Sequence, residues 1–271
     1  MIIELENVSK SYGPKPALRG VSVAAAPGEV LGYLGPNGAG KTTTVKILSA
    51  TLRPDAGRVT VCGLDAASDP VGVKSRIGYV PEVAALYESM TPTEYGRFVG
   101  RLHRLDEALL ERRLDTSLEI FGLGPNRHDL MATFSKGMKQ KVLIFTALLH
   151  NPPLVILDEP LNGLDANAAL LLKDIIARLA ARGRTVFYCS HLLDVVEKVC
   201  DRVIILKEGR VLADGTVDDV RALSESGSIE GAFSDLTSNT DWGGLAEEFV
   251  DSLGDSADSL GDSLGGIEGR P

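Results

Sequence analysis

The sequence predicts an α/β protein with a helical subdomain inserted into its core, and two patterns carry this prediction. Apolar runs such as those at residues 154–157 and 203–206 contain no polar residue, which is typical of strands buried on both faces of a parallel sheet. Helical patterns lie between such runs, at residues 41–48, 166–181 and 192–198. Strands that alternate with helices favour a parallel sheet covered by those helices.

Short β-type runs are expected to form the strands, and they lie at residues 2–8, 21–25, 30–34, 58–62, 77–80, 154–157, 185–189 and 203–206. Glu208 and Gly209 separate the last run from a further one at 211–213 and are typical of a hairpin turn. We therefore expect an antiparallel β subdomain or edge beside the parallel strands.

Residues from about 95 to 150 show helical patterns without a convincing strand, and a stretch rich in Gly, Pro and Asn divides them at 122–129. We therefore expect a helical subdomain, over about residues 84–150, inside a domain that spans residues 1–237. After Thr237 the composition shifts to Ser, Gly and Asp, which indicates a separate acidic tail at 238–271.

The charge of the chain is concentrated in this tail. Residues 238–271 hold eight acidic residues and one basic residue, a net charge of −7 out of −9 for the whole chain, so residues 1–237 carry only −2. Nucleic-acid binding requires clustered Lys and Arg, so no nucleic-acid partner is expected.

The tail also carries an amphipathic pattern with spacings of three and four residues, formed by Trp242, Leu245, Phe249, Leu253, Ala257, Leu260 and Leu264. Five glycines interrupt it, and each costs about 1 kcal/mol of helix propensity relative to Ala. Two interpretations stay open, a disordered tail and a helix that forms against a partner.

No apolar run of the 271 residues approaches the ~20 residues that a membrane helix needs, and the N-terminus lacks a signal-peptide pattern. Cys62, Cys189 and Cys200 are odd in number and far apart, so neither a disulfide framework nor a metal cluster is expected. These features predict a soluble protein of a reducing compartment.

A glycine-rich motif lies between the expected strand at 30–34 and the expected helix at 41–48. It matches the P-loop pattern G-x-x-x-x-G-K-[ST] and consists of Gly35, Pro36, Asn37, Gly38, Ala39, Gly40, Lys41 and Thr42. Such a loop turns backbone N–H groups toward phosphate oxygens, Lys41 is expected to reach the β- and γ-phosphates, and Thr42 to bind Mg²⁺. Thr43 is expected to contribute to nucleotide binding as well. The alternative, an accidental glycine-rich turn, does not account for the strand and helix on either side.

Two carboxylates end the apolar run at 154–157, which matches the Walker B pattern. We expect Asp158 to hold Mg²⁺ and Glu159 to act as the general base that polarises the attacking water. Acidic residues at the end of a strand can also be solvated loop residues, but the P-loop earlier in the chain favours the catalytic interpretation.

Together these motifs resemble those of the ATP-binding cassette (ABC) ATPases that drive transporters, and the resemblance covers roughly residues 1–237. Residues 134–138 (F-S-K-G-M) occupy the place of the family signature, usually L-S-G-G-Q, and depart from it at three positions. The resemblance implies that Ser135 and Gly137 contact the γ-phosphate bound by the opposite subunit. Taken alone, this motif favours a plain helix N-cap at Ser135.

Further positions match motifs of the same family. The resemblance implies that Tyr12 stacks on adenine, that Asp165 in N-G-L-D communicates across a dimer, and that His191 contacts the γ-phosphate and positions water. Glu82 stands where the family usually has a Gln that contacts Mg²⁺, and its carboxylate can still offer an oxygen ligand. Pro81-Glu82 together with the S-K-G-M sequence is most similar to the export-type branch.

The resemblance implies a P-loop NTPase core and an ATP-hydrolysing subunit that energises a membrane transporter, expected to be an exporter, with ATP as substrate and Mg²⁺ as cofactor. Two copies, or this chain and a paired ABC subunit, are expected to hold two ATP molecules between them. A separate permease is expected to carry the substrate, with residues 82–98 as the surface that pushes on it. The chain is then peripheral, at the cytoplasmic face of the cell membrane.

Other functional classes of protein fit the sequence less well. A non-transport ABC ATPase normally has tandem cassettes or long coiled-coil insertions, and a GTPase has an N-K-x-D motif, neither of which the sequence contains. A nucleotide-sensing regulatory module that does not hydrolyse ATP is the main non-enzyme alternative, and Glu159 and His191 argue against it.

Overall fold

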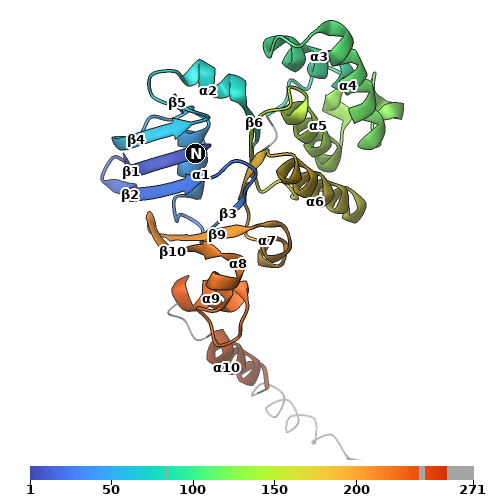
Figure 1. Ribbon diagram of the computed structural model, residues 1–271. Coiled ribbons are helices and arrows are strands. Elements are labelled where there is room, and N and C mark those ends of the chain that lie inside the picture. The colour runs from blue at the N-terminus through green and yellow to red at the C-terminus, as the bar shows by residue number, and fades with distance from the viewer. Residues whose placement is uncertain (84, 238–241, 255–271) are drawn as a thin grey trace, which may run out of the picture. The chain divides into compact units, whose positions relative to one another are not determined.

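The computed structural model of the chain describes residues 1–83, 85–237 and 242–254 (Figure 1). The chain divides into two compact units, Met1–Thr237 and Ser238–Pro271. In the second unit, helix α10 (Trp242–Gly254) is the part that the structure describes.

The first unit contains an antiparallel sheet built from the start of the chain. Its strands lie in the order β2-β1-β4-β5, and they are β2 (Lys15–Ala25), β1 (Ile3–Tyr12), β4 (Ala56–Val61) and β5 (Leu64–Asp65). Strand β1 pairs with β2 through several register shifts, so the alternation of buried and exposed residues is broken along its length.

The second sheet of this unit has the order β10-β9-β3-β8-β7-β6, and β10 is the strand that runs antiparallel to its neighbour. The strands are β10 (Arg210–Thr216), β9 (Arg202–Lys207), β3 (Val30–Leu34), β8 (Thr185–Cys189), β7 (Leu154–Asp158) and β6 (Ile77–Val80). The turn at Glu208 and Gly209 joins β9 to β10, as the sequence predicts.

Alternate residues of the central strands pack into two separate hydrophobic cores. In β7, Leu154 and Ile156 face one core, whereas Val155 and Leu157 face the other, and all four side chains are fully buried. A strand between two cores needs apolar residues at every position, which explains why β7 and β9 are uninterrupted apolar runs.

Helix α1 (Lys41–Leu48) contacts strands of both sheets and contributes Val45, Ile47 and Leu48 to the core between them. On the opposite face, α6 (Ala166–Ala181) packs Leu172 and Ile176 into the other core, together with Val195 and Val196 of α7 (Leu193–Val199). The loop between β3 and α1 is thereby fixed at the carboxyl end of the parallel strands.

The helical subdomain consists of α3 (Pro92–Leu102), α4 (Glu107–Ile120), two short 3₁₀ turns (Gly124–Asn126 and Met131–Thr133) and α5 (Lys136–Leu148). Side-chain caps set the start of each α-helix. Thr91 and Glu94 form a capping box at α3, Asp106 caps α4 and Ser135 caps α5.

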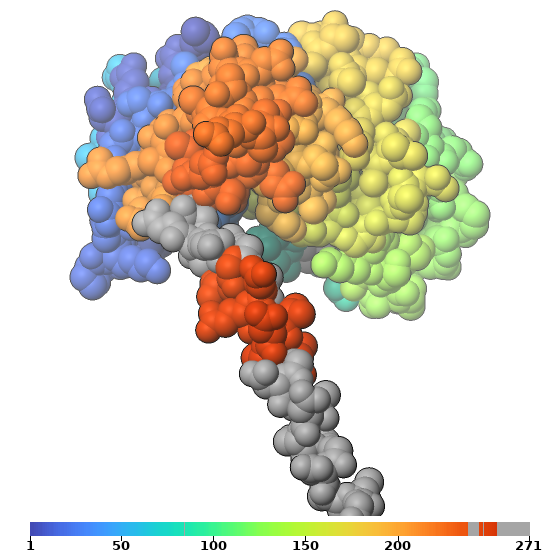
Figure 2. All heavy atoms as spheres, turned by 90° about the horizontal axis from the view of Figure 1, so that it is seen from below, coloured from blue at the N-terminus to red at the C-terminus, as the bar shows by residue number. Residues whose placement is uncertain are grey.

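The remaining helices of the first unit are α2 (Pro70–Arg76), α8 (Val217–Arg221) and α9 (Ile229–Thr237). Helix α9 contacts α7 and α8. In Figure 2, the part of the first unit after residue 200 forms the orange surface. The Glu197 carboxylate of α7 accepts a hydrogen bond from the backbone N–H of Ile229 at 2.7 Å, which fixes the start of α9.

The predicted α/β fold with antiparallel and helical parts is confirmed. Helix α2 was not predicted. The predicted strands at 2–8 and 21–25 are shorter than β1 and β2, which extend to the turn between Tyr12 and Lys15. Of the two interpretations of the tail, the structure has a helix at Trp242–Gly254, while the predicted pattern from Ala257 onward lies outside the described residues. None of the helices in the described ranges combines the length and the apolar character needed to cross a membrane.

Candidate functional site

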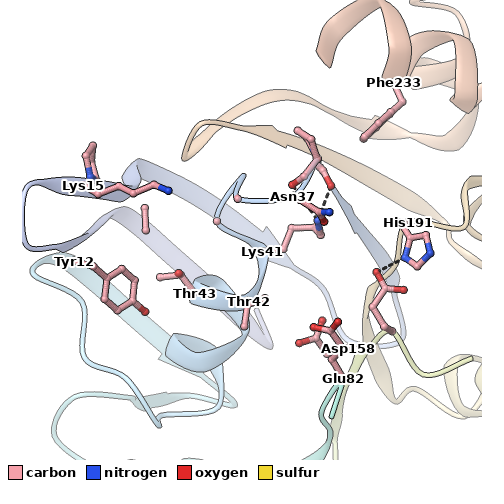
Figure 3. Close-up of a pocket in the computed structure, with 17 residues that line it drawn as sticks. Tyr12, Lys15, Asn37, Lys41, Thr42, Thr43, Glu82, Asp158, His191 and Phe233 are labelled. Atoms are coloured by element: carbon pink, nitrogen blue, oxygen red, sulfur yellow. Dashed lines mark hydrogen bonds and ion pairs between the residues drawn. The ribbon is translucent and has the colours of Figure 1, made fainter. Parts of the chain in front are cut away.

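A cavity of about 690 Å³ lies at the carboxyl ends of β3 and β7 (Figure 3). Ligands of open parallel sheets bind at this edge. The cavity is lined by Tyr12, Lys15, Pro16, Ala17, Gly35, Pro36, Asn37, Gly38, Gly40, Lys41, Thr42, Thr43, Glu82, Asp158, Glu159, His191 and Phe233. Residues from six separate parts of the sequence therefore meet in one place.

The glycine-rich loop forms one wall of this cavity. Gly40, at the N-cap of α1, has a φ of 115°, and a Cβ atom there would lie 2.6 Å from the Ala17 carbonyl oxygen, so only glycine fits. No side chain caps α1 and its first turn contains no acidic residue. Its N-terminal backbone N–H groups and its dipole are thus available to an anion.

Lys41 lies across the same loop. Its ammonium group donates hydrogen bonds to the carbonyl oxygens of Gly35, at 2.5 Å, and Pro36, at 3.2 Å. The positive charge is held at the mouth of the loop, where it can contact a phosphate group that enters the cavity.

Carboxylates gather at the end of the cavity where β6 and β7 pair. Asp158 is the last residue of β7, Glu159 follows it, and Glu82 lies two residues beyond β6. Burial, together with the charges of Glu82 and Glu159, raises the pKa of Asp158 to about 6. Figure 3 shows Glu82 and Asp158 side by side. Clustered negative charge of this kind favours a bound cation.

The oxygen donors at this end fit Mg²⁺ when phosphate is also bound. The Thr42 hydroxyl and the carboxylates of Asp158 and Glu82 line the same cavity, and hard cations prefer such ligands. Across the described ranges, no group of three or more His, Cys, Asp or Glu side chains is arranged to hold a metal by itself. Mg²⁺ accepts such an incomplete protein site because it takes its other ligands from phosphates and water.

Glu159 is held in an unusual backbone conformation beside His191. Its φ of 50° lies in the left-handed region, which costs a non-glycine residue about 1–3 kcal/mol and is typical of functional sites. Glu159 Oε1 lies 2.8 Å from His191 Nδ1 (Figure 3). Its Oε2 accepts a hydrogen bond from the Ser190 hydroxyl at 3.2 Å. The carboxylate faces the cavity opposite the glycine-rich loop.

Comparison with known proteins identifies the family. The model of the family described as ABC transporter matches residues 18–162, more than half of the chain. The chain belongs to the ABC transporter family. Within that family it is the ATP-binding subunit, an ATPase.

Curated relatives of this ABC ATPase include proteins named for drug resistance. The linearmycin resistance ATP-binding protein LnrL of Bacillus subtilis is 37% identical over 219 residues, covering 81% of this chain and 70% of the relative. The daunorubicin resistance ATP-binding protein DrrA3 of Streptomyces coeruleorubidus is 37% identical over 220 residues, with the same coverage.

Solved structures of ABC subunits share the fold. An ATP-binding subunit of an ABC transporter superposes with a TM-score of 0.83 at 36% identity, covering 88% of this chain and all of that one. A dimeric ATP-binding cassette, MJ0796, in a post-hydrolysis state with ADP and Pi, gives a TM-score of 0.73 at 25% identity, covering 79% and 98%. A third, cbiO1 from Clostridium perfringens, part of the complex cbiONQ, gives 0.70 at 28% identity, covering 82% and 90%.

Apart from Ala39, three of the predicted nucleotide-binding residues of this ABC ATPase lie outside the cavity, and they lie near one another elsewhere on the same chain. Ser135 caps α5 by accepting a hydrogen bond from the Met138 N–H at 3.2 Å. Asp165 caps α6 through the Ala168 N–H at 2.9 Å and lies 3.0 Å from the ammonium of Lys141 on α5. An ion pair thus links the start of α6 to α5, and neither Ser135 nor Asp165 lines the cavity of its own chain.

Gly137 shows how closely these segments pack. A Cβ atom on Gly137 would lie 2.5 Å from the carbonyl oxygen of Gly163, so any larger residue would push the two loops apart. The predicted signature position therefore requires glycine for packing as well as for any contact with phosphate.

The structure brings Tyr12, the P-loop, Glu82, the two Walker B carboxylates and His191 together around one cavity. Ala39 belongs to the P-loop but is buried behind it and does not line the cavity. The sequence analysis missed Lys15, Phe233 and Ser190. Lys15 follows the turn after Tyr12, which was a detectable signal, whereas no motif marks Phe233 on α9.

Proposed function

We propose that this chain hydrolyses MgATP in the cavity at the carboxyl ends of β3 and β7, as one half of a dimeric ATPase that energises a permease. The observation that carries the proposal is the meeting of Lys41, Asp158, Glu159 and His191 around one cavity. A phosphate clamp, a cation ligand and a general base are the parts that phosphoryl transfer to water requires.

Each group has a chemical role in this proposal. Lys41 and the loop N–H groups bind the β- and γ-phosphates, and Thr42, Asp158 and Glu82 hold Mg²⁺ directly or through water. Tyr12, half exposed at the end of β1, offers its ring to adenine at the far end of the cavity. Mg²⁺ would neutralise charge on the phosphates, which favours the displacement.

Glu159 accepts a proton from the attacking water, and His191 orients the γ-phosphate and that water. The 2.8 Å separation between Glu159 Oε1 and His191 Nδ1 supports joint action of the two side chains. The same contact favours hydrolysis over a purely regulatory nucleotide module, because binding alone does not require a base next to the phosphate.

A second copy completes the site. Ser135 and Gly137 do not line the cavity of their own chain, yet the start of α5 is positioned like an anion-binding helix terminus. We place these residues over the γ-phosphate bound by the other subunit, so that ATP favours the closed dimer and its hydrolysis favours the open one. The dimeric cassette MJ0796 supports this arrangement.

The permease contacts residues 82–98 in this proposal. This segment begins at Glu82 in the cavity and continues to exposed apolar side chains, with Val83 at 75% and Tyr87 at 58% exposure. The rings of Tyr87 and Phe98 lie 5.7 Å apart at 84° and form an apolar surface suited to protein contact. The ATPase would then lie at the cytoplasmic face of the membrane, and the drug-resistance names of two relatives favour export.

The Glu159→Gln variant tests the proposed chemistry. The amide keeps the size of the side chain but cannot accept a proton as a base, so ATP should bind while hydrolysis slows by about 10²-fold or more. Phosphate release and ATP-dependent dimer formation, measured by light scattering, give the two readouts. The exposed Glu225→Gln serves as the control and should behave as the parent. Turnover of Glu159→Gln at the parent rate would remove Glu159 as the base.

A further inference from the structure

The two carboxylate oxygens of Glu159 are held by consecutive residues that follow β8. His191 Nδ1 lies 2.8 Å from Oε1, and the Ser190 hydroxyl donates to Oε2 at 3.2 Å. The Glu159 backbone N–H also donates to the Cys189 carbonyl oxygen at 2.9 Å. One short segment of chain therefore sets both the backbone and the side chain of Glu159.

The two contacts differ in their exposure to water. The His191 side chain is 62% exposed, whereas Ser190 is only 1% exposed and Glu159 is 8% exposed. A hydrogen bond between buried groups does not compete with solvent and contributes more to geometry than an exposed contact does. Ser190 is the fixed contact of the carboxylate, and His191 is the contact that faces the cavity.

The hydrogen-bond pattern also fixes the direction of the Ser190 hydroxyl. The Leu192 N–H, at the N-cap of α7, donates to Ser190 Oγ at 3.1 Å. An ionised carboxylate can only accept, so the single hydroxyl proton of Ser190 is directed at Glu159 Oε2. The chain of bonds runs from the amide of Leu192 through the hydroxyl of Ser190 to the carboxylate.

We infer that Ser190 is a positioning residue that orients the Glu159 carboxylate toward the attacking water. The inference rests on the proposed role of Glu159 as general base. Ser190 does not line the cavity and acts only through Glu159. Loss of its hydroxyl leaves one carboxylate oxygen with no buried donor, so the carboxylate can rotate about its last side-chain bond and spends less time in the reactive geometry.

The test is a double-mutant cycle between Ser190 and Glu159 in the full chain with MgATP. Ser190→Ala should lower kcat by roughly tenfold, the size typical of a lost hydrogen bond to a charged group, with KM for ATP unchanged. In the Glu159→Gln background, single-turnover hydrolysis of radiolabelled ATP should show no further loss on adding Ser190→Ala. A structural defect would instead lower both rates by the same factor.

Three further variants show whether a loss of activity comes from misfolding. Ser190→Thr keeps the hydroxyl and should restore most of the kcat lost in Ser190→Ala, whereas Ser190→Cys keeps the size but donates weakly and should not. Ser117→Ala removes a part-buried hydroxyl that bonds to its own helix at the Arg113 carbonyl, away from the cavity, and should match the parent.

The outcomes separate the two proposals. Turnover of Glu159→Gln at the parent rate would contradict the role of Glu159 as general base, and with it the proposed mechanism of hydrolysis. Slow Glu159→Gln combined with parent-like kcat in Ser190→Ala, or equal losses in both backgrounds, would overturn only the role of Ser190. A Ser190→Thr variant that folds but loses as much as Ser190→Ala would also count against it.

Discussion

Single residues in the cavity carry opposite charges, which suit the proposed binding of phosphate. Burial and the carboxylates of Glu82 and Glu159 raise the pKa of Asp158, while the charge of Lys41 lowers it. Lys41 is only partly buried and lies on the loop that faces the carboxylates across the cavity. Anionic phosphate oxygens next to Lys41, with a divalent cation between them and the carboxylates, would satisfy both groups of charges.

The Lys41→Ala variant should therefore lose most of its affinity for ATP. The alanine removes the positive charge from the phosphate end without disturbing α1, so we expect ATP affinity to fall by at least about tenfold, as for loss of a charge-assisted hydrogen bond. Titration with a fluorescent ATP analogue measures the change. Lys46→Ala, an exposed residue of the same helix that does not line the cavity, is the matched control. Equal affinity in both variants would contradict the assignment of the loop.

Residues of the site that belong to contiguous motifs could be predicted, and residues that reach it through folding could not. Lys41 and Asp158 were predictable because each stands at a fixed place between a strand and its neighbours. Phe233 and Ser190 reach the site through the packing of α9 and of the segment after β8, and no spacing of residues in the sequence predicts that packing. Ser190 had one available signal, its position next to the predicted His191.

At the scale of elements, burial on both faces made some strands easy to predict, whereas register shifts made others difficult. The apolar runs of β7 and β9 are continuous because each separates two cores. Strands β1 and β2 carry polar residues and register shifts, so the alternation of apolar and polar residues does not show where these strands end. Helix α2 spans seven residues and contains Gly72 and Ser75, too short and too poor a helix former to stand out.

The helix at Trp242–Gly254 illustrates a conflict between two local signals. The apolar spacing of Leu245, Phe249 and Leu253 favours an amphipathic helix, whereas Gly243 and Gly244 oppose it. The helical pattern prevails in the structure. Propensity is a weak guide when a side-chain pattern of the right period is also present.

The junction of the helical subdomain with the core depends on two stacked histidines. The rings of His103, after α3, and His150, after α5, have centroids 3.6 Å apart, and His150 Nε2 lies 3.0 Å from the Ile77 carbonyl oxygen of β6. Burial, together with the neighbouring charges of His103 and Arg113, lowers the pKa of His150 to about 4. Burial also lowers the pKa of His103.

The sign of the pH effect follows from that shift. A pKa of about 4 in the folded chain, against about 6.5 when unfolded, means that the unfolded state binds the proton more tightly. The stability that depends on neutral His150 is complete above about pH 6.5 and is lost as the pH falls toward 4.

We therefore expect His150→Gln to make Tm less sensitive to acid. Its amide can still donate to the Ile77 carbonyl oxygen but does not titrate, so between pH 6.5 and 4 its Tm should fall by about 2–4 °C less than that of the parent. Differential scanning fluorimetry across this range gives the slopes, with the exposed His128→Gln as the control. Parallel slopes for parent and His150→Gln would show that His150 has no part in the acid sensitivity.

For the molecule as a whole, the cavity at the carboxyl ends of β3 and β7 belongs entirely to the unit Met1–Thr237, because every residue that lines it precedes Ser238. A chain that ends at Thr237 should bind ATP with unchanged affinity. Isothermal titration of the truncated and full chains makes the comparison, and the variant Lys41→Ala in each gives the baseline. A marked loss of affinity on truncation would assign residues 238–271 a direct part in nucleotide binding.

The whole-molecule proposal is that each ATP site is shared between two copies, with the P-loop from one and Ser135 and Gly137 from the other. This arrangement gives a role to the start of α5, which Ser135 caps and which lies outside the cavity of its own chain. Ser135→Arg should block the shared site from one side and Lys41→Ala from the other, so neither variant alone should hydrolyse ATP.

Mixing these two inactive variants tests the shared site most directly. A heterodimer of Ser135→Arg and Lys41→Ala holds one site with both of its halves intact, so phosphate release should recover to a part of the parent rate and should rise with the fraction of heterodimer. Heterodimer content is measured in parallel with two affinity tags. If heterodimers form and the mixture stays as inactive as its components, the shared site is contradicted.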